Sequence, residues 1–166
     1  MRILGIDPGY ERLGIAILEK SNADKKEKLI FSTCFKTSQV LSFEERLLLL
    51  GKEIHLIIKK YKPEVLAIEK LFLTSNQKSA MHVAETRGVI LYEAIKAGLK
   101  IFEASPGEIK LATTGYGKAD KEQVIKMVKL LIDMPSKVQS NLNTKDSDDE
   151  LDAIAIGLTA FAKLRF

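Results

Sequence analysis

The chain has 166 residues, of which 46% are hydrophobic and 29% charged, and its formal net charge is +4. This composition is typical of a soluble globular protein, and no apolar run reaches the roughly 18 residues that a membrane-spanning helix needs. The length predicts one domain over residues 1–166 with a hydrophobic core of its own. A single cysteine excludes an internal disulfide, and the first residues lack a signal-peptide pattern, which together favour a cytoplasmic location.

The sequence opens with an apolar strand that ends at an acid. Residues 2–6 form a compact apolar run, and the Pro-Gly turn that follows places Asp7 at the carboxyl end of this strand. Residues 13–18 and 29–36 predict two further strands, so the first three strands form an antiparallel meander. Cys34 is interpreted as an ordinary strand residue. The local sequence leaves two roles open for Asp7, a catalytic carboxylate or a cap of the turn.

A helix and a second acid-terminated strand come next. Ser42 and Glu45 have the spacing of a capping box, which predicts a helix over residues 43–60. Residues 65–68 are a short apolar run that predicts a buried strand, and this strand ends at Glu69. The arrangement of the first strand is therefore repeated.

The second half of the chain is mainly helical. The pattern predicts a long amphipathic helix over residues 76–97, a fifth strand over 100–104 and a further amphipathic helix over 119–132. Polar residues over 134–147 predict a loop before a last helix over 148–164. This order of elements predicts an α/β fold with a five-stranded mixed sheet, three antiparallel strands followed by two parallel ones, flanked by helices.

Four carboxylates are expected to meet at one edge of this sheet. Asp7 and Glu69 end parallel strands, while Asp149 and Asp152 lie one helical turn apart at the start of the last helix. The helix dipole alone explains acids in a first turn, but Asp152 precedes an apolar run, where an unpaired carboxylate is costly. Four oxygen donors favour magnesium, with manganese as a substitute. Two ions roughly 3.5 to 4 Å apart would suit displacement at a phosphodiester.

The two histidines and the lysines have simpler interpretations. His55 is assigned to the apolar face of the first helix and His82 to the long second helix, so both are expected to be structural. Lys118 and Lys121 belong to a lysine row opposite the apolar face of the helix predicted over 119–132, which is usually only a solvated face. Several acids fall in the predicted metal site, so the remaining surface is more basic than the net charge suggests, which favours a nucleic-acid partner.

Three motifs, in their order and spacing, resemble the RuvC family of Holliday-junction resolvases: GIDPGYERLGIAIL, AIEKLFLTSNQKSA followed by ETRG, and DELDAIAIG. The resemblance covers nearly the whole chain. It implies a ribonuclease H-like fold and a homodimeric, magnesium-dependent endonuclease that nicks two opposing strands of a four-way DNA junction, working with a branch-migration helicase complex. It also implies that the four catalytic acids are Asp7, Glu69, Asp149 and Asp152.

The same resemblance implies contacts with DNA. Lys110 and Lys121 match family lysines near the cleaved backbone, with Lys118 expected to contribute from the same basic face. Phe72 matches an aromatic residue that contacts the centre of the junction. Its leucine neighbours on both sides would equally suit a phenylalanine of the core, and both roles remain open for it.

Parts of the sequence also suit other functions. GYERLGIAI would fit a nuclease of the same fold that acts on structured RNA, such as a ribosomal RNA precursor, although the AIEKLF stretch argues against it. A non-catalytic DNA-binding module, or an actin-like nucleotide-binding domain with Asp7 at a phosphate loop, is a further alternative. A chain of 166 residues is too short for a two-domain actin-like ATPase.

Overall fold

A mixed β-sheet forms the centre of the molecule in the computed structural model. This structure describes residues 1–21, 23–71, 77–134 and 148–164. The five strands lie in the order β3-β2-β1-β4-β5. The first three strands pair antiparallel, whereas β1 with β4 and β4 with β5 are parallel. The predicted sheet is therefore confirmed. The strands are β1 (Arg2–Asp7), β2 (Arg12–Glu19), β3 (Lys28–Lys36), β4 (Val65–Glu69) and β5 (Lys100–Ala104).

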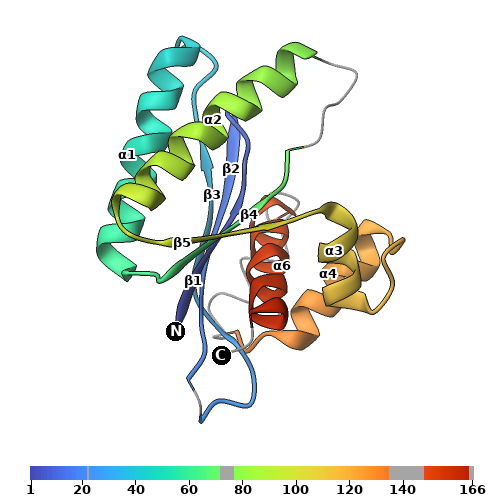
Figure 1. Ribbon diagram of the computed structural model, residues 1–166. Coiled ribbons are helices and arrows are strands. Elements are labelled where there is room, and N and C mark those ends of the chain that lie inside the picture. Colours follow the sequence, from blue (N-terminus) through green and yellow to red (C-terminus); the bar gives the residue numbers. More distant parts are fainter. Residues whose placement is uncertain (22, 72–76, 135–147, 165–166) are drawn as a thin grey trace.

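Helices cover both faces of the sheet (Figure 1). In the described part of the chain, one layer holds the first two helices and the other holds three more, the last of which lies directly against the sheet. Within the described ranges, every helix falls short of the length and apolar character needed to cross a bilayer. The helices are α1 (Phe43–Tyr61), α2 (Gln77–Lys96), α3 (Pro106–Thr114), α4 (Lys121–Leu131) and α6 (Asp148–Lys163).

The ends of α1 follow from local chemistry. The Ser42 hydroxyl accepts a hydrogen bond from the backbone N–H of Glu45 at 3.2 Å, and the Glu45 carboxylate accepts one from the N–H of Ser42 at 2.8 Å, as in the predicted capping box. The helix ends at Tyr61 because Lys62 adopts a left-handed conformation, with φ 50°, directly before Pro63. α4 begins two residues later than predicted, since Asp120 caps it.

Alternating side chains give each face of the sheet its own core. On the face toward α1 and α2, the strand residues Leu4, Ile6 and Ile15 pack with helix residues such as Leu50 and Ile90, all fully buried. On the opposite face, strand residues pack with α3, α4 and α6. The buried residues there include Ile3, Ala16, Leu18, Ala67, Ile109, Val124, Ala153 and Ile154.

The backbone of α6 rests directly on β1 and β2 at two glycines. A Cβ added at Gly5 would lie 2.2 Å from the carbonyl oxygen of Ala153, and one at Gly14 would lie 2.1 Å from that of Asp149. Real Cβ atoms cannot approach so closely, so only glycine allows this packing. It fixes the first turn of α6, with Asp149 and Asp152, at the carboxyl end of β1.

Two other predictions can be compared with the structure. The placement of His55 on an apolar face is wrong: its side chain is 54% exposed, and Nδ1 lies 3.1 Å from Oε2 of Glu93 on α2. His82 is half-buried and stacks on Phe43 with ring centroids 3.9 Å apart, which agrees with a structural role. Phe72 and the loop residues 135–147 lie outside the described part of the chain.

Candidate active site

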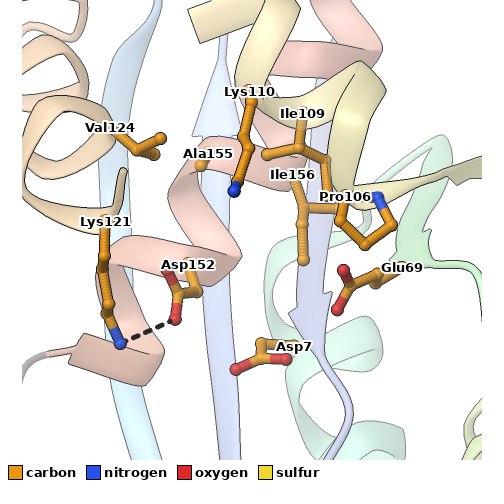
Figure 2. Close-up of a pocket in the computed structure, with 10 residues that line it drawn as sticks. All are labelled: Asp7, Glu69, Pro106, Ile109, Lys110, Lys121, Val124, Asp152, Ala155 and Ile156. Atoms are coloured by element: carbon orange, nitrogen blue, oxygen red, sulfur yellow. Dashed lines mark ion pairs between the residues drawn. The ribbon is translucent and has the colours of Figure 1, made fainter. Parts of the chain in front are cut away.

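Three of the four predicted acids line one pocket at the edge of the sheet (Figure 2). Asp7 ends β1, Glu69 ends β4, and Asp152 comes from α6. Because β1 and β4 are parallel neighbours, with Ile6 opposite Ile68, the next residue of each strand emerges at the same edge. The glycine contacts under α6 bring Asp152 to the same place. The pocket is otherwise lined by Pro106, Ile109, Lys110, Lys121, Val124, Ala155 and Ile156.

Burial, and to a lesser degree the charge of nearby acids, raises the pKa of each carboxylate in the pocket. Burial, and then the charges of Asp152, Glu69 and Asp149, raise the pKa of Asp7 from 3.8 to about 7. Burial and the charge of Asp152 raise the pKa of Glu69. Burial also raises the pKa of Asp152, although Lys121 opposes this shift. The site therefore carries more negative charge than its own basic residues balance.

Lys121 is the basic group nearest to this charge. Its Nζ lies 3.4 Å from Oδ2 of Asp152 and 3.1 Å from Oδ2 of Asp148. Burial lowers the pKa of Lys121, but the carboxylates of Asp152 and Asp148 outweigh this effect, so the pKa of Lys121 is raised overall. Lys110 extends toward the pocket from α3 (Figure 2). Lys118 is exposed and is not part of the pocket lining.

Asp149 lies close to the pocket but faces away from it. Its Oδ2 accepts a hydrogen bond from Nε of Arg12 at 2.6 Å and a weaker one from the Cys34 thiol at 3.3 Å. Burial, and then the hydrogen bond to Asp149, raise the pKa of Cys34 to about 11, so its thiol stays protonated and can donate. The carboxylate is thus held over β2 and β3, away from Glu69 on β4.

Sequence reasoning missed two arginines that organise the site. Arg12 lies within the first motif and binds Asp149, but the sequence alone indicates no role for it. Arg87, in the ETRG motif, donates from Nε to the backbone carbonyl of Glu69 at 3.1 Å and forms an ion pair with Glu103 on β5. It therefore links the end of β4 to α2 and β5. The sequence offered one signal for Arg87: it belongs to the ETRG motif, and no function had been assigned to that motif.

The donor chemistry of the pocket fits a divalent cation. Asp7, Glu69 and Asp152 supply only carboxylate oxygens, and their pKa values are raised chiefly by burial, so a bound cation would stabilise their ionised forms. Among the described residues, no three His, Cys, Asp or Glu side chains are already arranged to hold one metal ion. Binding would therefore require side chains to turn, and Asp152 would have to exchange Lys121 for the ion.

A mixed sheet in this strand order, with carboxylates at the ends of β1 and β4 and on the last helix, defines a nuclease of the ribonuclease H-like class. Residues 3–160 match the family model described as "Crossover junction endodeoxyribonuclease RuvC". The chain therefore belongs to the RuvC family, as the sequence motifs predicted.

Curated relatives and solved structures agree with this assignment. The crossover junction endodeoxyribonuclease RuvC of Caldicellulosiruptor saccharolyticus is 40% identical over 158 residues, which cover 95% of this chain and 90% of the relative. That of Thermosipho melanesiensis is 39% identical over 166 residues and the full length of both chains. The structure of Thermus thermophilus RuvC in complex with a Holliday junction substrate has a TM-score of 0.82 and 28% identity, covering 97% of this chain and 93% of that one.

Proposed function

We propose that this protein resolves four-way DNA junctions by paired, symmetric nicks, through metal-assisted hydrolysis of phosphodiester bonds. The observation that carries the proposal is the RuvC match over residues 3–160, together with the likeness to a RuvC structure bound to a Holliday junction. These relatives act on DNA junctions, which favours this function over the alternative nuclease for structured RNA. We treat residues 1–166 as a single nuclease domain.

Asp7, Glu69 and Asp152 are the proposed catalytic residues and metal ligands, with Asp149 as the fourth. Magnesium is the proposed ion, two per site, with manganese as a substitute, because the donors are all carboxylates. Bound metal would supply an activated water and stabilise the leaving oxygen. The chain's own part is to hold the carboxylates together at the edge of the sheet, where Ile109 and Val124 add apolar side chains to the pocket lining.

The proposed DNA contacts surround this pocket. Lys110 and Lys121, which both line the pocket, are the proposed contacts to phosphates near the cleaved bond. Lys118 precedes α4 and is exposed, where it can contact a more distant phosphate. Phe72 is assigned to the junction centre on the family resemblance alone.

Two symmetric nicks call for a two-fold dimer with two active sites. The proposed interface is α2, which exposes Met81 by 63%, Tyr92 by 62% and Ile95 by 63%, beside Leu48 and Leu56 of α1, each 59% exposed. Several exposed apolar side chains on two adjacent helices are typical of an interface. A branch-migration helicase is the proposed further partner, and the bacterial cytoplasm the proposed location.

Light scattering tests the dimer. Met81→Glu should shift the protein toward monomer, because it buries a charge in the interface. Val40→Glu is the matched control, since Val40 is 94% exposed but lies between β3 and α1. A wild-type protein that stays monomeric at micromolar concentration, with or without junction DNA, contradicts the proposed dimer.

The cleavage assay compares a synthetic four-way junction with linear duplex and structured RNA, with and without magnesium. Glu69→Gln and Asp152→Asn should abolish cutting but keep junction binding, because binding comes from basic residues and phosphates. Asp148→Asn is a matched control: Asp148 is another acid of the first turn of α6 that contacts Lys121, but it does not line the pocket. It should still cut. Normal cutting by Asp152→Asn would show that the assigned site is wrong.

A further inference from the structure

The ion pair between Arg12 and Asp149 joins the start of β2 to the first turn of α6. Nε of Arg12 donates to Oδ2 of Asp149 at 2.6 Å, and the two side chains are 38% and 23% exposed. The Cys34 thiol donates to the same oxygen. Gly14 of β2 is paired with Cys34 of β3, so Arg12 and Cys34 approach the carboxylate from the same side of the sheet. Both donors therefore hold it away from β4.

The backbone of Asp149, in contrast, already lies beside Asp7. Its carbonyl oxygen sits over Gly14, which is the strand partner of Asp7. A Cβ built at Gly14 would lie 3.1 Å from the Cβ of Asp7, so little separates the two acids at the level of the main chain. Turning the Asp149 side chain, without moving the helix, would direct its carboxylate toward the pocket.

Charge explains why the Asp149 side chain faces away from the pocket. Asp7, Glu69 and Asp152 already share one pocket, where Lys121 is the cation paired with Asp152. A fourth carboxylate would add repulsion there. Arg12 offers Asp149 a charge-assisted hydrogen bond outside the pocket instead. A divalent cation would reverse this preference, because it attracts every carboxylate within reach.

We propose that Arg12 is a positioning residue that holds Asp149 out of the pocket until a divalent cation binds, and that cation and guanidinium compete for this one carboxylate. The inference rests on the proposed function for one point, that the pocket of Asp7, Glu69 and Asp152 binds a divalent cation. Arg12 acts on the site through its hydrogen bond to Asp149. Its effect is to lower the affinity of the pocket for a divalent cation and to reduce repulsion between the carboxylates.

Calorimetric titration with Mn²⁺, in the absence of DNA, measures this competition. Arg12→Gln should bind Mn²⁺ more tightly, by about two- to fivefold, the range that a partly exposed ion pair can contribute. Arg12→Lys keeps the charge and should remain close to wild type. In an Asp149→Asn background, Arg12→Gln should change the affinity little, because residue 149 then carries no charge for the guanidinium to hold. If Arg12→Gln still increased Mn²⁺ affinity in that background, the increase would come simply from removing a positive charge near the site, and the proposal would be overturned.

Arg2→Gln provides a matched control for the loss of an arginine. Nε of Arg2 donates to Oε1 of Glu19 at 2.7 Å, and the side chains are 39% and 33% exposed, so the pair closely resembles that of Arg12. It lies at the opposite ends of β1 and β2. Its removal should leave Mn²⁺ affinity unchanged. Equal gains from Arg2→Gln and Arg12→Gln would overturn the proposal.

A magnetic resonance titration with Mg²⁺ separates failure of this inference from failure of the proposed function. The side-chain Nε–H signal of Arg12 should shift as Mg²⁺ is added, and should not respond in Asp149→Asn. If the backbone amides of Asp7 and Glu69 shift while the Arg12 signal stays in place, the cation site is real and the competition is refuted. If none of these signals responds at saturating Mg²⁺, the proposed metal site fails, and the competition fails with it.

Discussion

Replacing Asp7 by asparagine should make the metal-free protein more stable at neutral pH, although it removes a proposed catalytic acid. Burial and three neighbouring carboxylates raise the pKa of Asp7 from 3.8 to about 7. The folded state therefore disfavours the ionised form, whereas the unfolded chain does not. Asparagine has a similar shape and carries no charge, so it removes this penalty.

The magnitude and its pH dependence follow from that difference in pKa. A rise from 3.8 to about 7 corresponds to about 4 kcal/mol, at roughly 1.36 kcal/mol per pH unit. The neighbouring acids share the proton, and the new amide must itself be hydrogen-bonded, so we expect a gain of about 2 to 4 kcal/mol. Below pH 4 the carboxyl is protonated in both states and the gain is absent. It grows between about pH 4 and 7 and is complete above pH 7.

Thermal melts in EDTA provide the assay. At pH 8 the Tm of Asp7→Asn should exceed that of wild type by roughly 4 to 16 °C, for a protein of this size. At pH 4 the two should melt together. Excess Mg²⁺ should raise the Tm of wild type more than that of the variant, because it neutralises the carboxylates that asparagine cannot supply. Equal melting temperatures at pH 8 in EDTA would refute the argument from buried, uncompensated charge.

Three further outcomes can be measured. Gly5→Ala should lower the free energy of unfolding by about 3 kcal/mol or more in a denaturant titration, because α6 must move away from β1. Gly107 has open space around it, so Gly107→Ala should stay within about 1 kcal/mol of wild type. Phe72→Ala should lose junction cleavage while keeping its Tm; a large drop in Tm with normal cleavage would assign Phe72 to the core instead. Lys110→Ala should weaken junction binding and make its logarithmic salt dependence shallower by about one; an unchanged slope would exclude a phosphate contact.

The edge of the sheet where the site lies could be predicted from the sequence. Asp7 and Glu69 each follow an apolar run that is too short for a helix, and parallel strands deliver their last residues to one side. Asp152 could be added because an apolar run follows it on the same helix. These inferences depend on the pattern of apolar residues, which can be recognised within a short stretch of sequence.

The partners of individual side chains could not be predicted in this way. Asp149 binds Arg12 and Cys34, which are 137 and 115 residues away in the chain. Sequence spacing places Asp149 on the same helix face as Asp152, but the final direction of its carboxylate depends on which cations are nearby after folding. His55 illustrates a related limit: it follows the buried Ile54, and one step of about 100° around a helix is enough to expose it.

The docking of α6 on Gly5 and Gly14 has a consequence for protein synthesis. The proposed site takes Asp7 from β1 and Asp152 from α6 (Asp148–Lys163), which lies far later in the chain. One of the two cores of the sheet is likewise completed only by α6. A nascent chain still attached to the ribosome, or a product truncated before α6, would expose that face of the sheet and lack an acid. With the proposed site, nuclease activity becomes available only after α6 has been made, so a chain that ends before α6 is not expected to cut DNA.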